Sequence, residues 1–154
     1  EIELPTPVDA VTILCDSLNY LRTEEDVKQT FTHVAAILKE GGRLLFDTHS
    51  PYKMETLFNG KTYATHAEQS SYIWFADPGE APLSVVHELT FFIEEEDGRY
   101  ERVDETHHQR TYPPAQYVTW LREAGFRVLA VTGDFGPDAP SETAERIFFV
   151  AEKM

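Results

Sequence analysis

Polar side chains directly follow two apolar segments of the chain. Cys15–Tyr20 comes at the end of the apolar run Val8–Cys15, and Asp47–Ser50 comes after the short run that begins at Arg43. Because α/β sheets bind ligands beyond the carboxyl ends of their strands, both polar segments are candidate binding sites. For the first segment a purely structural role is equally well supported, since Asp, Ser and Asn also turn the chain and cap helices.

The second polar segment carries groups that could transfer a proton. Asp47, His49 and Tyr52 follow the second apolar run, and carboxylates and imidazoles are common general acids and bases. Asp47 and His49 would share a face of an extended segment. Neither HExxH nor paired CxxC motifs occur, so we expect no metal site. Cys15 closes a predicted buried strand and is expected to pack rather than to act as a nucleophile.

A third polar group lies near the end of the middle region. His107, His108, Arg110 and Tyr112 follow one another closely. Neighbouring residues of a strand point to opposite faces, so at most one of the two histidines faces a site. A role as a solvated strand residue is slightly favoured for His107. His108 and Arg110 are therefore candidates for contact with a substrate, and Arg110 would suit a carboxylate or phosphate.

The sequence around the first two polar segments predicts a strand, a helix, a second strand and a second helix. Val8–Cys15 and Arg43–Asp47 are rich in apolar and β-branched residues, which is typical of strands buried on both faces of a parallel sheet. Thr23 is a good N-cap before three acidic residues, and apolar residues then recur at helical spacing. Gly41–Gly42 is expected to end that helix. Ser50, followed by Pro, opens a further short helix.

The middle of the chain changes to an antiparallel pattern. Strands are predicted at Ser70–Phe75, Leu83–Glu95 and Arg99–Gln109, and Asp97–Gly98 is a strong hairpin signal. We expect residues 65–112 to form an antiparallel layer attached to the rest.

The last part of the chain returns to alternating elements. Pro113–Pro114 opens a helix that Gly125 ends, and strands are predicted at Val128–Thr132 and Ile147–Ala151. Strand–helix–strand units of this kind predict an α/β fold with helices on the faces of a sheet.

Composition limits the classes of partner. The chain has 154 residues with 13 basic and 27 acidic side chains, a formal net charge of −14. Such a charge repels phosphate backbones and disfavours nucleic acid as a partner. No apolar run is long enough to span a membrane. The single cysteine fits a reducing compartment, so we expect the protein in the cytoplasm.

A phosphate-binding glycine loop is missing from the sequence. Doubly wound nucleotide-binding domains begin with a strand that leads into a glycine-rich turn. Neither GxGxG nor GxxxxGK[ST] occurs here, and the close pair Gly41–Gly42 lies at a predicted helix end. The first half of such a fold is therefore either absent from this chain or never existed in the protein.

Three segments give the sequence a family resemblance. They are Val8–Leu21 (VDAVTILCDSLNYL), Leu38–Asp47 (LKEGGRLLFD) and Arg122–Val128 (REAGFRV). In this order they resemble the fourth strand, the fifth strand with its preceding double glycine, and the approach to the sixth strand of class I S-adenosylmethionine-dependent methyltransferases. The resemblance is to a small bacterial group with an antiparallel lid inserted after the fifth strand.

The resemblance implies a fold and a cofactor. The chain would be the C-terminal part of a Rossmann-like methyltransferase sheet, with residues 1–64 and 113–154 as core and residues 65–112 as lid. The residues at the fourth-strand tip would flank S-adenosylmethionine; they are Cys15, Asp16, Ser17, Leu18, Asn19 and Tyr20. The glycine loop and the residues that hold ribose and adenine would precede Glu1.

Two hypotheses of different classes follow. The first is an enzyme that methylates a small molecule, of which this chain alone is inactive and does not bind the cofactor. The second is a non-catalytic α/β module that binds a ligand or a partner chain. Under the first hypothesis the strand Val8–Cys15 has an open apolar edge, so the chain is expected to self-associate.

Overall fold

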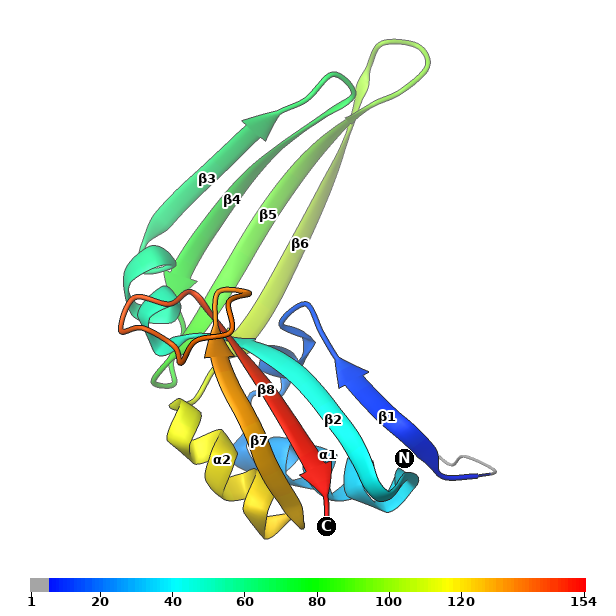
Figure 1. Cartoon of the computed structure of the whole chain (residues 1–154). Helices are drawn as coiled ribbons and strands as arrows, with labels where there is room; N and C mark the ends of the chain where they lie inside the picture. Colours follow the sequence, from blue (N-terminus) through cyan, green and yellow to red (C-terminus); the bar gives the residue numbers. More distant parts are fainter. Residues whose placement is uncertain (1–5) are drawn as a thin grey trace.

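Two four-stranded sheets form the chain (Figure 1). The structure, a computed structural model, describes residues 6–154, so the first five residues of the predicted domain lie outside the described part. The core sheet has the order β1-β2-β8-β7, with strands Val8–Ile13, Leu38–His49, Arg146–Lys153 and Phe126–Gly133. The lid sheet has the order β3-β4-β5-β6, with strands Lys61–His66, Ser70–Pro78, Ser84–Glu94 and Tyr100–Arg110. The predicted α/β fold with an antiparallel insertion is confirmed.

Both α-helices cover the same face of the core sheet. Helix α1 spans Glu24–Ile37 and helix α2 spans Pro114–Glu123. The side chain of Thr23 accepts a hydrogen bond from the backbone N–H of Asp26 at 3.1 Å, which confirms the predicted cap. The apolar faces of both helices join a single core with the inner residues of the sheet, where the rings of Phe46 and Phe149 stack with centroids 4.5 Å apart.

The other face of the core sheet is not covered by either described helix. Leu14 and Leu129 on that side are 47% and 43% exposed, and Cys15 is exposed as well. The prediction that Val8–Cys15 is buried on both faces is therefore wrong. Direct parallel pairing is limited to β1 and β2, because β8 lies antiparallel between β2 and β7, although β7 runs in the same direction as β1 and β2.

The double glycine lies inside a strand rather than at the end of a helix. Helix α1 ends at Ile37, and β2 begins at Leu38. The register of β1 and β2 jumps between the pairs Val8–Leu38 and Ala10–Arg43, so β2 bulges there. Gly41 has φ +75°, and a Cβ on the next glycine would lie 2.8 Å from a backbone oxygen. Glycine is thus required by the bulge and not by a helix cap.

The lid sheet begins earlier than the sequence pattern indicated. Strand β3, Lys61–His66, pairs with β4, so the boundary predicted between residues 64 and 65 falls inside a lid strand. A polar strand with many exposed residues lacks the apolar alternation that reveals strands. The hairpin predicted at Asp97–Gly98 is confirmed, since Gly98 has φ +80° and joins β5 to β6.

Two short helical segments and several polar contacts join the lid to the core. The segments are η1, Ser17–Tyr20, and η2, Lys53–Leu57. Asn19 Nδ2 donates to the carbonyl of Arg110 at 2.8 Å, and Thr111 Oγ1 donates to the carbonyl of His49 at 2.6 Å. Tyr112 completes the junction through its hydroxyl, which donates to the carbonyl of Arg22. The lid therefore extends from the carboxyl ends of β1 and β2 (Figure 1).

Candidate functional site

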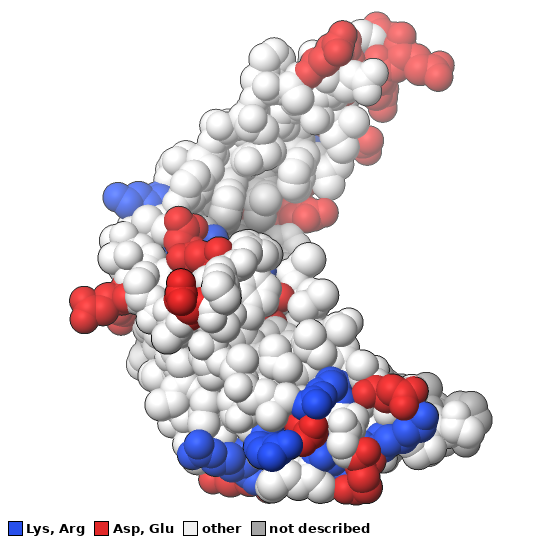
Figure 2. Space-filling view, in the orientation of Figure 1, with Lys and Arg blue, Asp and Glu red and all other residues white. Residues whose placement is uncertain are grey.

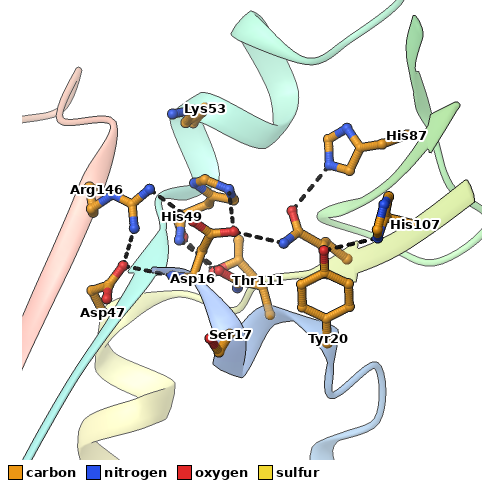
Figure 3. Close-up of polar contacts among 12 residues, drawn as sticks. Asp16, Ser17, Tyr20, Asp47, His49, Lys53, His87, His107, Thr111 and Arg146 are labelled. Atoms are coloured by element: carbon orange, nitrogen blue, oxygen red, sulfur yellow. Dashed lines mark hydrogen bonds and ion pairs between the residues drawn. The ribbon is translucent and has the colours of Figure 1, made fainter. Parts of the chain in front are cut away.

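A cavity of about 370 Å³ lies where the lid meets the core sheet. The core contributes polar side chains from the ends of β1, β2 and β8, and the lid contributes residues from one face of β4, β5 and β6 (Figure 3). The residues that line the cavity include Asp16, Tyr20, His49, Trp74, His87, His107, Gln109 and Arg146. The cavity matches the place where α/β sheets bind ligands.

Arg146 holds two carboxylates together at the edge of the core sheet. Its guanidinium donates to Asp47 and, at 2.9 Å, to Asp16 Oδ1. The backbone N–H of Asp16 donates to Asp47 Oδ2 at 3.0 Å. Asp134 Oδ1 in turn accepts from the backbone N–H of Arg146 at 3.0 Å, which fixes the start of β8. Asp47 is therefore a buried structural partner of Arg146 rather than a group that faces the cavity.

Asp16 stays ionised despite its partial burial. Burial by itself raises the pKa of this carboxyl, but hydrogen bonds from His49, Gln109 and Arg146 outweigh it and hold the pKa well below its usual range. The Asp16 carboxylate is the point on which side chains from both sheets converge. It gives the cavity a permanent negative charge beside the tip of β1.

His49 is buried at the end of β2, 5% exposed. Its Nε2 lies 3.4 Å from Asp16 Oδ2, and its ring meets Phe58 edge-on with centroids 5.3 Å apart. Its backbone N–H donates to Asn19 Oδ1 at 2.8 Å, and this bond fixes the backbone from which the ring extends. Its Nδ1 is buried and has no hydrogen-bond partner among residues 6–154. An imidazole that is oriented by a carboxylate and has one unpaired nitrogen can act as a general base.

His87 on β5 connects the lid to Asp16. It accepts a hydrogen bond from Trp74 Nε1 at 3.0 Å, and its Nε2 lies 3.1 Å from Gln109 Oε1. Gln109 Nε2 donates to Asp16 Oδ2 at 2.8 Å. Burial lowers the pKa of His87 to about 4, although the hydrogen bond to Gln109 acts in the opposite direction. His87 is thus neutral at neutral pH.

The low pKa of His87 predicts a loss of stability in mild acid. An unfolded histidine takes up a proton near pH 6.5, whereas His87 in the folded chain resists protonation down to about pH 4. The unfolded state therefore gains a proton first, and the free energy of unfolding should fall between these two pH values. Urea unfolding at successive pH values should show this fall in the wild type and a smaller one in His87→Gln. An equal pH dependence in both proteins would contradict the assignment.

Tyr20 and His107 meet across the mouth of the cavity. The Tyr20 hydroxyl lies 3.1 Å from His107 Nδ1, and His107 Nε2 lies 3.0 Å from Glu105. Burial, with the charges of Asp16 and Glu105, raises the pKa of Tyr20. His107 therefore faces the cavity, and the interpretation that favoured a solvated role for it is wrong.

His108, Arg110 and Tyr52 lie away from the cavity. His108 is exposed on the opposite face of β6 from His107. Arg110 donates to the carbonyls of Arg22 and Pro82 and lies over the ring of Tyr112, so it supports the junction between the sheets. Tyr52 lines a separate hollow beside α2. Of the proposed catalytic candidates, His49 alone lines the cavity.

The side chains of the six residues at the tip of β1 lie in different surroundings. Asp16 and Tyr20 line the cavity, and Cys15 lies exposed beside them. Leu18 and Asn19 are 2% and 0% exposed, because the first joins the core and the second bridges the two sheets. The hydroxyl of Ser17 donates to the carbonyl of Leu14. Cys15 and Asp16 have φ +58° and +52°, an uncommon backbone for residues other than glycine.

Four cavity residues were not found from the sequence. Trp74, His87, Gln109 and Arg146 belong to no short motif, and their roles arise from strand pairing. Arg146 pairs with His49 across β2 and β8, although they are 97 positions apart in the sequence (146 − 49). Only knowledge of that register would have brought them together.

The described residues hold neither a metal-binding cluster nor a membrane-spanning helix. Between residues 6 and 154, no group of three His, Cys, Asp or Glu side chains is arranged to hold a metal ion. In the same part of the chain, no helix is long and apolar enough to span a membrane.

Comparison with curated proteins gives two clear relatives. "Putative methyltransferase GWCH70_2453" of Geobacillus sp. (strain WCH70) is 54% identical over 153 residues, which are 99% of this chain and 62% of that protein. "Putative methyltransferase YqeM" of Bacillus subtilis (strain 168) is 47% identical over 145 residues, or 94% of this chain and 58% of that protein. The chain thus spans about three fifths of the length of these relatives. No model of a protein family matches it.

Solved structures agree with these relatives. An S-adenosylmethionine-dependent methyltransferase from Clostridium acetobutylicum superimposes with a TM-score of 0.91 at 24% identity, covering 99% of this chain and 61% of that one. Over nearly its whole length the chain is similar to proteins named putative methyltransferases, and it has the fold of an S-adenosylmethionine-dependent methyltransferase. DesVI of Streptomyces venezuelae has the same fold, with a TM-score of 0.77 at 18% identity over 100% of this chain and 62% of that one. The family resemblance carried by the strand motifs is confirmed.

The chemistry of the β1 tip would suit the methyl-bearing end of S-adenosylmethionine, on which the enzyme from Clostridium acetobutylicum depends. The sulfonium of S-adenosylmethionine is cationic, and Asp16 offers an ionised carboxylate beside the ring of Tyr20, which is 48% exposed. The sequence offers no glycine loop for the rest of the molecule. The residues present therefore suit one end of the cofactor.

Proposed function

We propose that a protein containing this chain transfers a methyl group from S-adenosylmethionine to a small-molecule acceptor. The observation that carries the proposal is the pair of His49 and Asp16, which lies in the cavity directly beside the exposed tip of β1. A buried base next to the cofactor-binding tip of a methyltransferase sheet is what a proton-bearing acceptor requires. Homology to methyltransferases favours this hypothesis over a non-catalytic binding module.

Each residue of the pair has a separate role. S-adenosylmethionine supplies an electrophilic methyl group on a good leaving group, so the protein mainly aligns the reactants. Asp16 and Tyr20 attract the cationic end of the cofactor. His49 takes the proton that the acceptor loses, and the Asp16 carboxylate 3.4 Å away stabilises the resulting imidazolium. Phe58 and Trp74 form an apolar wall of the cavity on its lid side.

The size and charge of the cavity favour a small acceptor that is not an anion. A volume of about 370 Å³ suits a small molecule. Both nearby cations are already paired, Arg146 with Asp16 and Asp47 and Lys53 with Glu145, so neither is left for a phosphate or carboxylate. Acidic residues cover the lid tip (Figure 2), which disfavours nucleic acid. CalS10, a structural neighbour at TM-score 0.75 and 18% identity, is named an amino pentose methyltransferase, an acceptor of the same size class.

Transfer of a labelled methyl group tests this proposal. The product of the whole reading frame that contains this chain is incubated with methyl-tritiated S-adenosylmethionine and separate small-molecule, protein and nucleic-acid fractions of a bacterial extract. We expect label to appear in the small-molecule fraction. The assay is run under reducing conditions, because the single cysteine suggests a cytoplasmic protein. Label confined to protein or nucleic acid, or no transfer at all, would refute the proposed acceptor class or the activity.

The 154-residue chain alone should not bind S-adenosylmethionine usefully. It presents one end of the cofactor with Asp16 and Tyr20, but its sequence has no glycine loop for the rest. Calorimetric titration of the chain is expected to give no measurable heat at a ligand concentration at which the longer product saturates. Micromolar binding to the 154 residues would show that these residues suffice.

We also expect the isolated chain to self-associate. Strand β1 is an edge of the core sheet, and the uncovered face beside it exposes Leu14 and Leu129. Free strand edges and apolar faces recruit other chains. Light scattering at increasing concentration should show species larger than the 17.6 kDa monomer. A monomer at every concentration would count against an available edge.

A further inference from the structure

A line of three hydrogen bonds runs from the lid sheet to the carboxylate of Asp16. Trp74 lies on β4, His87 on β5 and Gln109 on β6, so one residue from each of three adjacent lid strands takes part. The line ends at Asp16, which follows β1 of the core. It is therefore a direct polar connection between the two sheets.

The two ends of this line determine the direction of every bond between them. An indole N–H can only donate, and an ionised carboxylate can only accept. Because Trp74 donates to Nδ1 of His87, the neutral imidazole carries its proton on Nε2. That N–H needs an acceptor, so Gln109 must present Oε1 to His87 and its NH₂ group to Asp16. With the opposite amide orientation, the carbonyl oxygen of Gln109 would face the carboxylate, and neither could donate.

Burial prevents water from replacing these bonds. His87 is 5% exposed and Gln109 is 4% exposed. A buried polar group that loses its partner is costly, so the side chains have one satisfied arrangement. Phe58 packs edge-on against the rings of both His87 and His49, so the same ring limits the movement of both imidazoles.

We propose that His87 is a positioning residue: by setting the orientation of the Gln109 amide, it holds the Asp16 carboxylate toward His49 and Arg146. The importance of this for catalysis rests on the proposed function, in which Asp16 orients His49. The hydrogen-bond geometry itself does not depend on that function. Among the described residues His87 makes no hydrogen bond to Asp16, and its hydrogen-bonded connection to that carboxylate runs through Gln109.

The wild-type protein gives the first test. A long-range ¹H–¹⁵N spectrum at neutral pH distinguishes the two neutral tautomers of histidine. We expect His87 to carry its proton on Nε2, with an unprotonated Nδ1 that accepts from Trp74. A proton on Nδ1, or a charged ring, would overturn the proposal without any substitution that could disturb folding.

The titration of Asp16 gives the second test. The ¹³C resonance of its carboxyl is followed on acidification in the wild type, His87→Leu, His87→Gln and His108→Leu. Glutamine keeps one acceptor and one donor at position 87, whereas leucine keeps neither. We expect His87→Leu to raise the titration midpoint by about one pH unit, the effect of one hydrogen bond to a charged group. His87→Gln should restore the wild-type midpoint. The control, His108→Leu, changes a histidine on the outer face of the lid and should leave the titration midpoint of Asp16 unchanged.

Activity separates positioning from packing. In the longer product, His87→Leu should lower kcat about tenfold with little change in KM for the cofactor, and His87→Gln should recover most of it. An unchanged Asp16 midpoint in His87→Leu, or no recovery with glutamine, would refute the positioning role. Absence of methyl transfer from the wild type would refute the proposed function, while the tautomer and the Asp16 midpoint would still decide the role of His87.

Discussion

Replacing His49 by alanine in the longer protein should lower the turnover of methyl transfer by about 10²- to 10⁴-fold, the usual contribution of a positioned general base. His49 is 5% exposed and its Nε2 lies 3.4 Å from Asp16, so no other imidazole occupies an equivalent place in the described cavity. Affinity for S-adenosylhomocysteine should change little, because Asp16 and Tyr20, which we propose face the cofactor, remain. Turnover is measured as S-adenosylhomocysteine released, and affinity by calorimetry.

A matched control comes from the other face of the lid. His108 is exposed and does not line the cavity, so His108→Ala should leave turnover unchanged. Thermal unfolding of both variants checks that each is folded. If His49→Ala keeps wild-type turnover, the acceptor either needs no base or finds one elsewhere, and the role assigned to His49 is wrong.

Replacing Arg146 by methionine should lower the free energy of unfolding by about 3–5 kcal/mol, the cost of breaking a buried ion pair on one side. Asp47 is 1% exposed, and Arg146 is the cation that it pairs with. The same guanidinium also binds Asp16, so methionine leaves two carboxylates close together without a cation. The change is measured by urea unfolding at neutral pH.

The neighbouring strand offers a control for this substitution. Arg127 on β7 pairs with Glu152, but its side chain is 62% exposed. Because exposed ion pairs contribute little, Arg127→Met should cost less than about 1 kcal/mol. Equal losses of stability in Arg146→Met and Arg127→Met would show that burial of the Arg146 ion pairs does not explain their contribution to stability. A double substitution of Arg146 and Asp47 by apolar residues should recover part of the lost stability.

The fold was largely predictable because its signals are local. The helices after Thr23 and Pro113, the hairpin at Asp97–Gly98 and the last two strands follow from caps, turns and periodicity. Where prediction failed, a longer-range interaction decided the structure. Gly41–Gly42 has the pattern of a helix end, but pairing with β1 draws it into a bulged strand. Strand β3 is polar and is defined by its pairing with β4.

The candidate site was only half predictable for the same reason. Asp16 and Tyr20 lie in the segment after β1, and His49 is the last residue of β2, so their position in the sequence indicates their position in the fold. His87, Gln109 and Arg146 become neighbours through pairing between strands that are distant in sequence. The choice between His107 and His108 depends on which face of β6 turns inward, and a strand with polar residues on both faces does not reveal that.

The central claim is that the cavity between the core sheet and the lid receives the methyl acceptor beside the tip of β1. A crystal structure of the longer protein with S-adenosylhomocysteine tests it most directly. The sulfur of the bound molecule should lie at the mouth of the cavity, next to Asp16 and Tyr20, with His49 on the far side of the space left for the acceptor. A sulfur that faces away from this cavity, or a molecule bound elsewhere on the protein, would contradict the claim.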